Sequence, residues 1–141
     1  MRKVLVPVDG SSSAERAVRY VVALSKTYPA LEVVLVNIQL PVANWEVGSF
    51  LKKEEVEAVA VSRGGDTLQP ARALLEAAGV RYTPVVLIGP AGELIVNTAI
   101  EHQCDGIVMG TRGMGNAANM LLGSVSSEVI QRAEIPVTLI K

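Results

Sequence analysis

The residues whose types and spacing point most directly to chemistry are three glycines in the last third of the chain. Gly110 and Gly113 are separated by two residues, and Gly123-Ser124 follows after nine more. The segment lies between an apolar run, residues 107–109, and a predicted helix. Glycine lets a backbone come close to a ligand, and a helix N-terminus offers free N–H groups and a positive dipole end. Together these features suit a phosphate group.

Two further candidates for ligand contact follow predicted strands elsewhere in the chain. Asp9 comes directly after the apolar run 3–8, and Ile38 ends the run 32–38. In an open parallel sheet, ligands bind beyond the carboxyl ends of the strands, where the strand order reverses. Asp9 could contact ribose hydroxyls or a phosphate-bound Mg²⁺, or it could be a turn residue that satisfies local N–H groups. The main chain around Ile38 could meet a flat base.

Other nucleotide, metal and catalytic patterns are absent from the sequence. The phosphate-loop pattern GxxxxGK[ST] does not occur, and Gly110-x-x-Gly113 is not the GxGxxG of dinucleotide-binding folds. His102 and Cys104 have no further His or Cys to complete a metal site. The serines at 11–13 lack a histidine base, so we interpret them as helix-capping residues. We predict neither catalytic nor metal-ligating residues.

The elements that must position these residues follow from periodicity. Short aliphatic runs bounded by turn-forming residues predict strands over 3–8, 32–38, 82–88, 106–109 and 136–140. Helices are predicted between them. The first has Ser12 as its N-cap and Glu15 three residues on, as in a capping box. The others are expected over 52–62 and 66–78, interrupted by Gly64-Gly65, and over 93–102 and 125–133. Strands that alternate with helices indicate a parallel sheet with right-handed crossovers.

Composition limits the class of protein. The 141 residues fit a single domain spanning 1–141, and a net charge of −1 gives no electrostatic footprint for nucleic acid. The single cysteine, Cys104, excludes an internal disulfide and fits a reducing compartment. No apolar run approaches the ~20 residues that span a bilayer. The first apolar run is also too short for a signal peptide. We therefore expect a cytoplasmic protein with neither membrane nor nucleic-acid partners.

Taken together, these motifs resemble the universal stress protein family. Residues 110–124 match the family pattern G-x2-G-x9-G-[ST] at every fixed position, and residues 4–11, 105–110 and 135–140 are also similar. The similarity covers essentially the whole chain and is weakest over 41–69. It implies a Rossmann-like, three-layer α/β fold of the adenine nucleotide alpha hydrolase-like type. That fold has about four helices and a five-stranded parallel sheet in the order 3-2-1-4-5.

The resemblance also implies a ligand and the residues that hold it. Family members with the full glycine pattern bind ATP. Carried over by position, the residues expected near the adenosine are Pro7, Val8 and Asp9, with the Ile38 main chain at the adenine and Met109 and Gly110 near the ribose. Those expected near the phosphates are Arg112, Gly113, Gly123, Ser124, Val125 and Ser126. The family further implies a homodimer through the last strand, which is predicted from Pro136 to Ile140.

Two departures from the family pattern bear on the ligand. Residues 114–122 contain no Lys or Arg, so Arg112 is the one cation inside the motif, and a triphosphate would depend on main-chain N–H groups and Mg²⁺. The loop after the second strand, residues 40–48, is long. Both departures leave AMP or ADP open beside ATP. The leading hypothesis is an ATP-binding regulatory domain that couples nucleotide binding to an unidentified protein partner in a stress response. The alternatives are a slow Mg-dependent ATPase and a dimeric interaction module with a vestigial nucleotide site.

Overall fold

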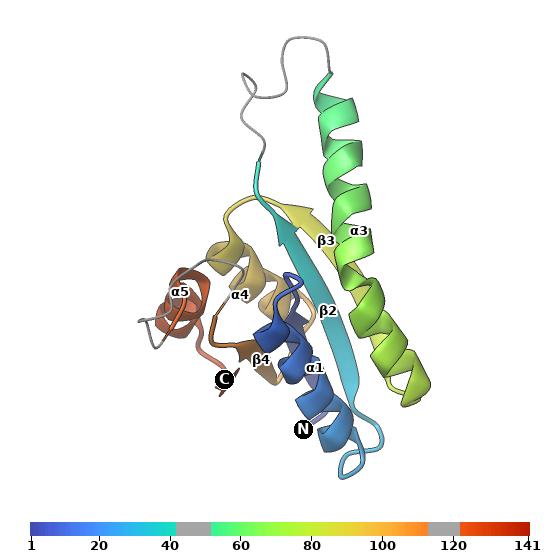
Figure 1. Ribbon diagram of the computed structural model, residues 1–141. Helices are drawn as coiled ribbons and strands as arrows, with labels where there is room; N and C mark the ends of the chain where they lie inside the picture. The colour runs from blue at the N-terminus through green and yellow to red at the C-terminus, as the bar shows by residue number, and fades with distance from the viewer. Residues whose placement is uncertain (42–51, 113–121) are drawn as a thin grey trace.

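The computed structural model describes residues 1–41, 52–112 and 122–141. Within these ranges the strands are β1 (Lys3–Pro7), β2 (Glu32–Gln39), β3 (Arg81–Ile88), β4 (Gly106–Gly110) and β5 (Val137–Ile140). The helices are α1 (Ser12–Ser25), α3 (Lys53–Ala77), α4 (Ala91–Glu101) and α5 (Ser124–Arg132) (Figure 1). All strand pairs are parallel, in the order β3-β2-β1-β4-β5. The predicted fold is confirmed. Of the predicted long loop 40–48, residues 42–48 lie outside the described ranges.

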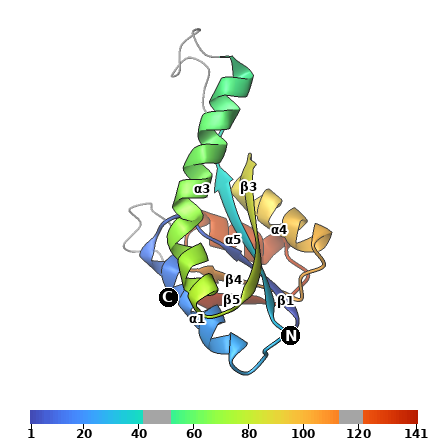
Figure 2. The ribbon, with the colours of Figure 1, turned by 90° about the vertical axis from the view of Figure 1, so that its right-hand side faces the viewer.

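The sheet is covered on both faces. Helices α1 and α3 lie on one face, and α4 and α5 lie on the other (Figure 2). Successive side chains of a strand point to opposite faces, so each strand contributes to both layers. Val33 and Leu35 pack under α3, while Val34 and Val36 pack under α4. This double burial explains why the strands read as unbroken aliphatic runs. None of the described helices is long and apolar enough to cross a membrane.

Helix α1 is capped by Ser11 and not, as predicted, by Ser12. The Ser11 hydroxyl accepts a hydrogen bond from the Ala14 N–H at 3.2 Å. Asp9 decides this choice, because its Oδ1 accepts the Ser11 N–H at 2.9 Å and helps to hold Ser11 in an extended conformation. The predicted capping box from Ser12 to Glu15 is therefore not formed, and the residue three after Ser11 is Ala14, which cannot complete such a box.

Helix α3 is continuous, so the predicted interruption at Gly64-Gly65 is wrong. Gly64 faces the sheet, where a Cβ atom would lie 2.8 Å from Asn37 Oδ1 and would also overlap Val86. Glycine is needed here for the close approach of helix and sheet, and its weak helix propensity is outweighed by that packing. Buried side chains of α3 begin at Ala60, and the preceding turns project past the end of the sheet (Figure 1). The remaining strand and helix ends lie within two residues of their predicted positions.

Candidate functional site

Strands β1 and β4 separate near the carboxyl edge of the sheet. Their pairing reaches only Leu5↔Ile107, whereas β1 pairs with β2 as far as Pro7↔Val36. The Val8 N–H donates to β2, and backbone groups alternate along a strand, so the Pro7 nitrogen faces β4. Proline has no N–H to donate there. A crevice therefore opens between β1 and β4, at the point where the strand order reverses.

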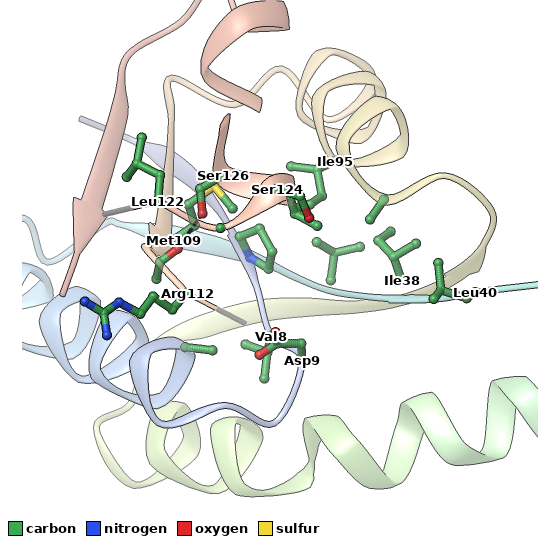
Figure 3. A pocket seen from close by; sticks show the side chains of 17 residues that line it. Val8, Asp9, Ile38, Leu40, Ile95, Met109, Arg112, Leu122, Ser124 and Ser126 are labelled. Atoms are coloured by element: carbon green, nitrogen blue, oxygen red, sulfur yellow. Dashed lines mark hydrogen bonds between the residues drawn. The ribbon is translucent and has the colours of Figure 1, made fainter. Parts of the chain in front are cut away.

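A cavity of about 400 Å³ occupies this crevice (Figure 3). Every predicted site residue that the structure describes lines it: Pro7, Val8, Asp9, Ile38, Met109, Gly110, Arg112, Gly123, Ser124, Val125 and Ser126. Gly113 lies outside the described residues. The fold thus brings these separated segments of the chain to one cavity.

Sequence reasoning missed one wall of the cavity. Ala91 and Ile95 of α4 line it, together with Val36, Leu40, Ala14 and Leu122. The available signal was the turn Gly89-Pro90, which follows β3 and so comes to the same edge of the sheet. Ile95 and Leu40 lie with Ile38 on one side of the cavity, and these apolar side chains give that part the character of a surface for a flat ring (Figure 3).

The helix N-termini at the cavity differ in how well their N–H groups are satisfied. Helix α1 is capped by Ser11. Helix α4 has no side-chain cap, but Glu128 packs its carboxylate against Gly92 in the first turn. Helix α5 begins after Gly123 with neither a side-chain cap nor an acidic residue in its first turn. The N-terminus of α5 is therefore the one best suited to an anion.

Serine hydroxyls fix the segment between β4 and α5 from two sides. The Ser13 hydroxyl of α1 donates to the Arg112 carbonyl. The Ser126 hydroxyl of α5 lies 3.1 Å from the Gly110 carbonyl oxygen and 3.2 Å from that of Thr111. Its proton is thus directed to the backbone. The Gly123 N–H also donates to Thr111 O, at 2.6 Å. Residues 110–112 are held between the first turns of α1 and α5.

The charged side chains that line the described part of the cavity are Asp9 and Arg112. Asp9 Oδ1 accepts the Ser11 N–H, so the carboxylate has the turn role that the sequence left open, and it also borders the cavity. The Arg112 side chain is exposed and extends away from Ile38 and Leu40 (Figure 3). In the described ranges no group of three His, Cys, Asp or Glu side chains could hold a metal ion.

Comparison with known proteins identifies the family. The model of the universal stress protein family matches residues 1–141. The chain belongs to this family. The universal stress protein MJ0531 of Methanocaldococcus jannaschii is 33% identical to it, over 99% of this chain and 82% of the relative. A universal stress protein of Thermus aquaticus is also 33% identical, over 99% of this chain and 98% of the relative.

Solved structures of universal stress proteins share the fold. The structure of MJ0577 from M. jannaschii has a TM-score of 0.87 at 31% identity, covering 99% of this chain and 95% of that one. A universal stress protein from Archaeoglobus fulgidus, solved in complex with dAMP, has a TM-score of 0.68 at 26% identity and covers 100% of this chain and 98% of that one. The universal stress protein described here therefore has relatives that span essentially its whole length.

Proposed function

We propose that this universal stress protein binds an adenine nucleotide in the crevice between β1 and β4, and that nucleotide occupancy regulates its contact with a protein partner in a cytoplasmic stress response. The observation that carries the proposal is the cavity itself, which has an apolar wall at one part and the uncapped N-terminus of α5 at another. The A. fulgidus relative solved with dAMP supports an adenine nucleotide as the ligand class.

The cavity suggests how the nucleotide is oriented. The base would lie by Ile38, Leu40 and Ile95, where apolar side chains can cover a flat ring. The phosphates would lie at the first turn of α5, where the N–H groups of Ser124 and Val125 begin a helix without a side-chain cap. Asp9, at the end of β1, would face the ribose or a phosphate-bound metal ion.

We propose ATP with Mg²⁺ as the physiological ligand, with AMP and ADP as alternatives. Asp9 is the one carboxylate that lines the described part of the cavity. Mg²⁺ would therefore arrive bound to phosphate oxygens, with Asp9 as its protein contact, which is how this ion is commonly held in nucleotide sites. When bound, the ion would neutralise phosphate charge that Arg112 alone leaves uncompensated.

We further propose that the protein is a homodimer through β5. This strand lies at one edge of the sheet and pairs with β4 on its other side. An edge strand carries a row of backbone donors and acceptors that can pair with another chain. Pairing across a two-fold axis would satisfy these groups in both copies at once.

The test is direct. The purified protein is denatured, any released nucleotide is identified, and the emptied protein is titrated calorimetrically with ATP and AMP, with and without Mg²⁺. We expect saturable binding of adenine nucleotides, which Gly123→Val abolishes by placing a branched side chain at the N-cap of α5. Failure to bind either nucleotide at millimolar concentration would contradict the proposal. Turnover of ATP that Asp9→Asn abolishes while binding persists would instead establish a slow ATPase.

A further inference from the structure

Asn37 is a buried polar side chain next to the cavity that does not line it. It is 3% exposed and lies in β2 between Val36 and Ile38, which do line the cavity. Because side chains alternate along a strand, Asn37 points to the opposite face of the sheet, where α3 covers it at Gly64. Its side chain is not among those that line the cavity.

Both ends of the Asn37 amide are hydrogen-bonded. Nδ2 donates to the Val8 carbonyl oxygen at 2.8 Å, and Oδ1 accepts from Gln39 Nε2 at 2.7 Å. Val8 lines the cavity and is the first residue after β1. The amide thus connects the face of the sheet under α3 to the backbone at the cavity on the other side.

The hydrogen bond from the Asn37 side chain to the Val8 carbonyl takes the place of a backbone hydrogen bond between β1 and β2. Val36 O accepts the Val8 N–H at 2.8 Å, and Gln39 O accepts the Gly89 N–H at 3.0 Å. Even-numbered residues of β2 therefore direct their backbone groups to β1 and odd-numbered residues to β3. In a regular parallel pair, the next backbone hydrogen bond would run from the Ile38 N–H to the Val8 carbonyl. Among the described residues this bond is not made, and the carbonyl accepts from Asn37 instead.

We propose that Asn37 is a positioning residue of the nucleotide site: by satisfying the Val8 carbonyl from the far face of the sheet, it leaves the Ile38 main chain available to the edge of an adenine ring. The inference rests on the proposed function. Adenine presents an acceptor, N1, beside a donor, the N6 amino group, and a free N–H and C=O complement this pair. Guanine presents N1–H and O6, the reverse pattern. Asn37 would therefore contribute to the choice of base as well as to affinity.

Amide hydrogen exchange tests the structural half of the proposal. In the ligand-free protein, the Ile38 amide should exchange faster than the Val36 amide of the same strand, and AMP should slow it. In Asn37→Leu the Val8 carbonyl loses its donor, so the Ile38 N–H should bond to it and become protected without AMP. An Ile38 amide that is already as protected as Val36 in the free wild-type protein would overturn the proposal.

Affinity and base choice test the functional half. Asn37→Leu should weaken AMP binding about tenfold and narrow the preference for AMP over GMP. Gln39→Ala removes only the donor that orients the amide and should cause a smaller loss, about threefold. The matched control is Thr98→Val, which removes another polar group that is 3% exposed but bonds within α4, to Leu94 O. This control should keep both affinity and base preference.

The outcomes separate the two proposals. If the wild-type protein binds AMP and both Asn37→Leu and Gln39→Ala bind it equally well with unchanged base preference, the role of Asn37 is wrong and the nucleotide site stands. If the wild-type protein binds no adenine nucleotide, the proposed function fails and the role of Asn37 fails with it. Gln39 is only half-buried, so Gln39→Ala keeps the test decisive if Asn37→Leu does not fold.

Discussion

A Cβ atom at Gly110 would lie 2.8 Å from the carbonyl carbon of Ser13, so the end of β4 and the first turn of α1 meet at a distance that glycine alone allows. The first glycine of the segment 110–124 thus has a packing role in addition to its place in the cavity wall. The hydrogen bond from the Ser13 hydroxyl to the Arg112 carbonyl depends on this contact.

Gly110→Ala should therefore destabilise the whole domain. The added methyl group must displace the backbone of α1, and overpacking of this kind costs about 1–3 kcal/mol. Urea unfolding followed by circular dichroism measures the change in the free energy of unfolding. A variant with the wild-type unfolding midpoint would show that α1 and β4 are not in such close contact.

The adjacent glycines of α3 should respond in opposite ways to alanine. A Cβ atom at Gly65 meets nothing within 4 Å, so Gly65→Ala should stabilise the protein by about 0.5–1 kcal/mol through helix propensity. Gly64→Ala should destabilise it, because the methyl group would press on Asn37 and Val86. Unfolding midpoints of the two variants give the comparison. Loss of stability in Gly65→Ala would argue against a continuous α3.

Arg112 should distinguish nucleotides by the length of their phosphate chain. Its side chain extends away from Ile38, beside which we propose the base to lie (Figure 3). We therefore expect it to meet the distal phosphates and not the α-phosphate. Arg112→Ala should leave AMP affinity unchanged and weaken ATP about two- to fivefold, as expected for an exposed ion pair. Arg112→Lys keeps the charge and serves as the control in calorimetric titrations. Equal losses for AMP and ATP would place the side chain at the α-phosphate.

Cys104 should be chemically inert in the folded protein. Burial raises the pKa of its thiol to about 11, above the ordinary value of about 8.5. Alkylation by iodoacetamide at pH 8.5 should be slow in the native state and rapid in urea, since the thiolate is the nucleophile. A raised pKa also means that this group stabilises the fold fully below pH ~8.5, and that the contribution is lost as the pH rises toward 11. Cys104→Ala should remove that part of the pH dependence.

Leu139 offers a test of the proposed dimer. The carbonyl oxygens of Pro136 and Ile140 accept hydrogen bonds from the N–H groups of Ile107 and Thr111. Even-numbered residues of β5 therefore direct their backbone groups to β4. Leu139 directs its N–H to the open edge of the sheet. Leu139→Pro should abolish pairing between copies while leaving the bonds to β4 in place. Leu139→Val keeps the N–H and should remain dimeric. Light scattering after gel filtration reports the mass, and a dimeric Leu139→Pro would exclude pairing through β5.

Much of the fold could be predicted from local sequence, because five aliphatic runs and their turn residues determine a buried parallel sheet. The errors occurred where a tertiary contact outweighed a local preference. Gly64-Gly65 has poor helix propensity, yet the helix continues because Gly64 fits against Asn37. The position of the first cap was wrong because the Asp9 carboxylate selects Ser11 over Ser12.

The site was predicted less completely than the fold. The glycine segment and Asp9 were found because turn residues at strand ends stand out in a sequence. The wall formed by Ala91 and Ile95 was missed, since apolar helix residues look the same whether they face a cavity or the core. The hydrogen bond from the Asn37 side chain to the Val8 carbonyl was also missed. A polar residue in an aliphatic strand was the only signal, and its role depends on which neighbour each backbone group faces.

Pro7 has a consequence for how the crevice behaves before any ligand arrives. A residue with an N–H at this position could bond to β4 and draw the two strands together. With proline at this position, β1 and β4 are already separated in the ligand-free fold, and a ligand can enter without breaking hydrogen bonds between them. A ligand that binds there avoids the free-energy cost of separating β1 from β4. The cavity is therefore preorganised by the lack of an N–H group at Pro7.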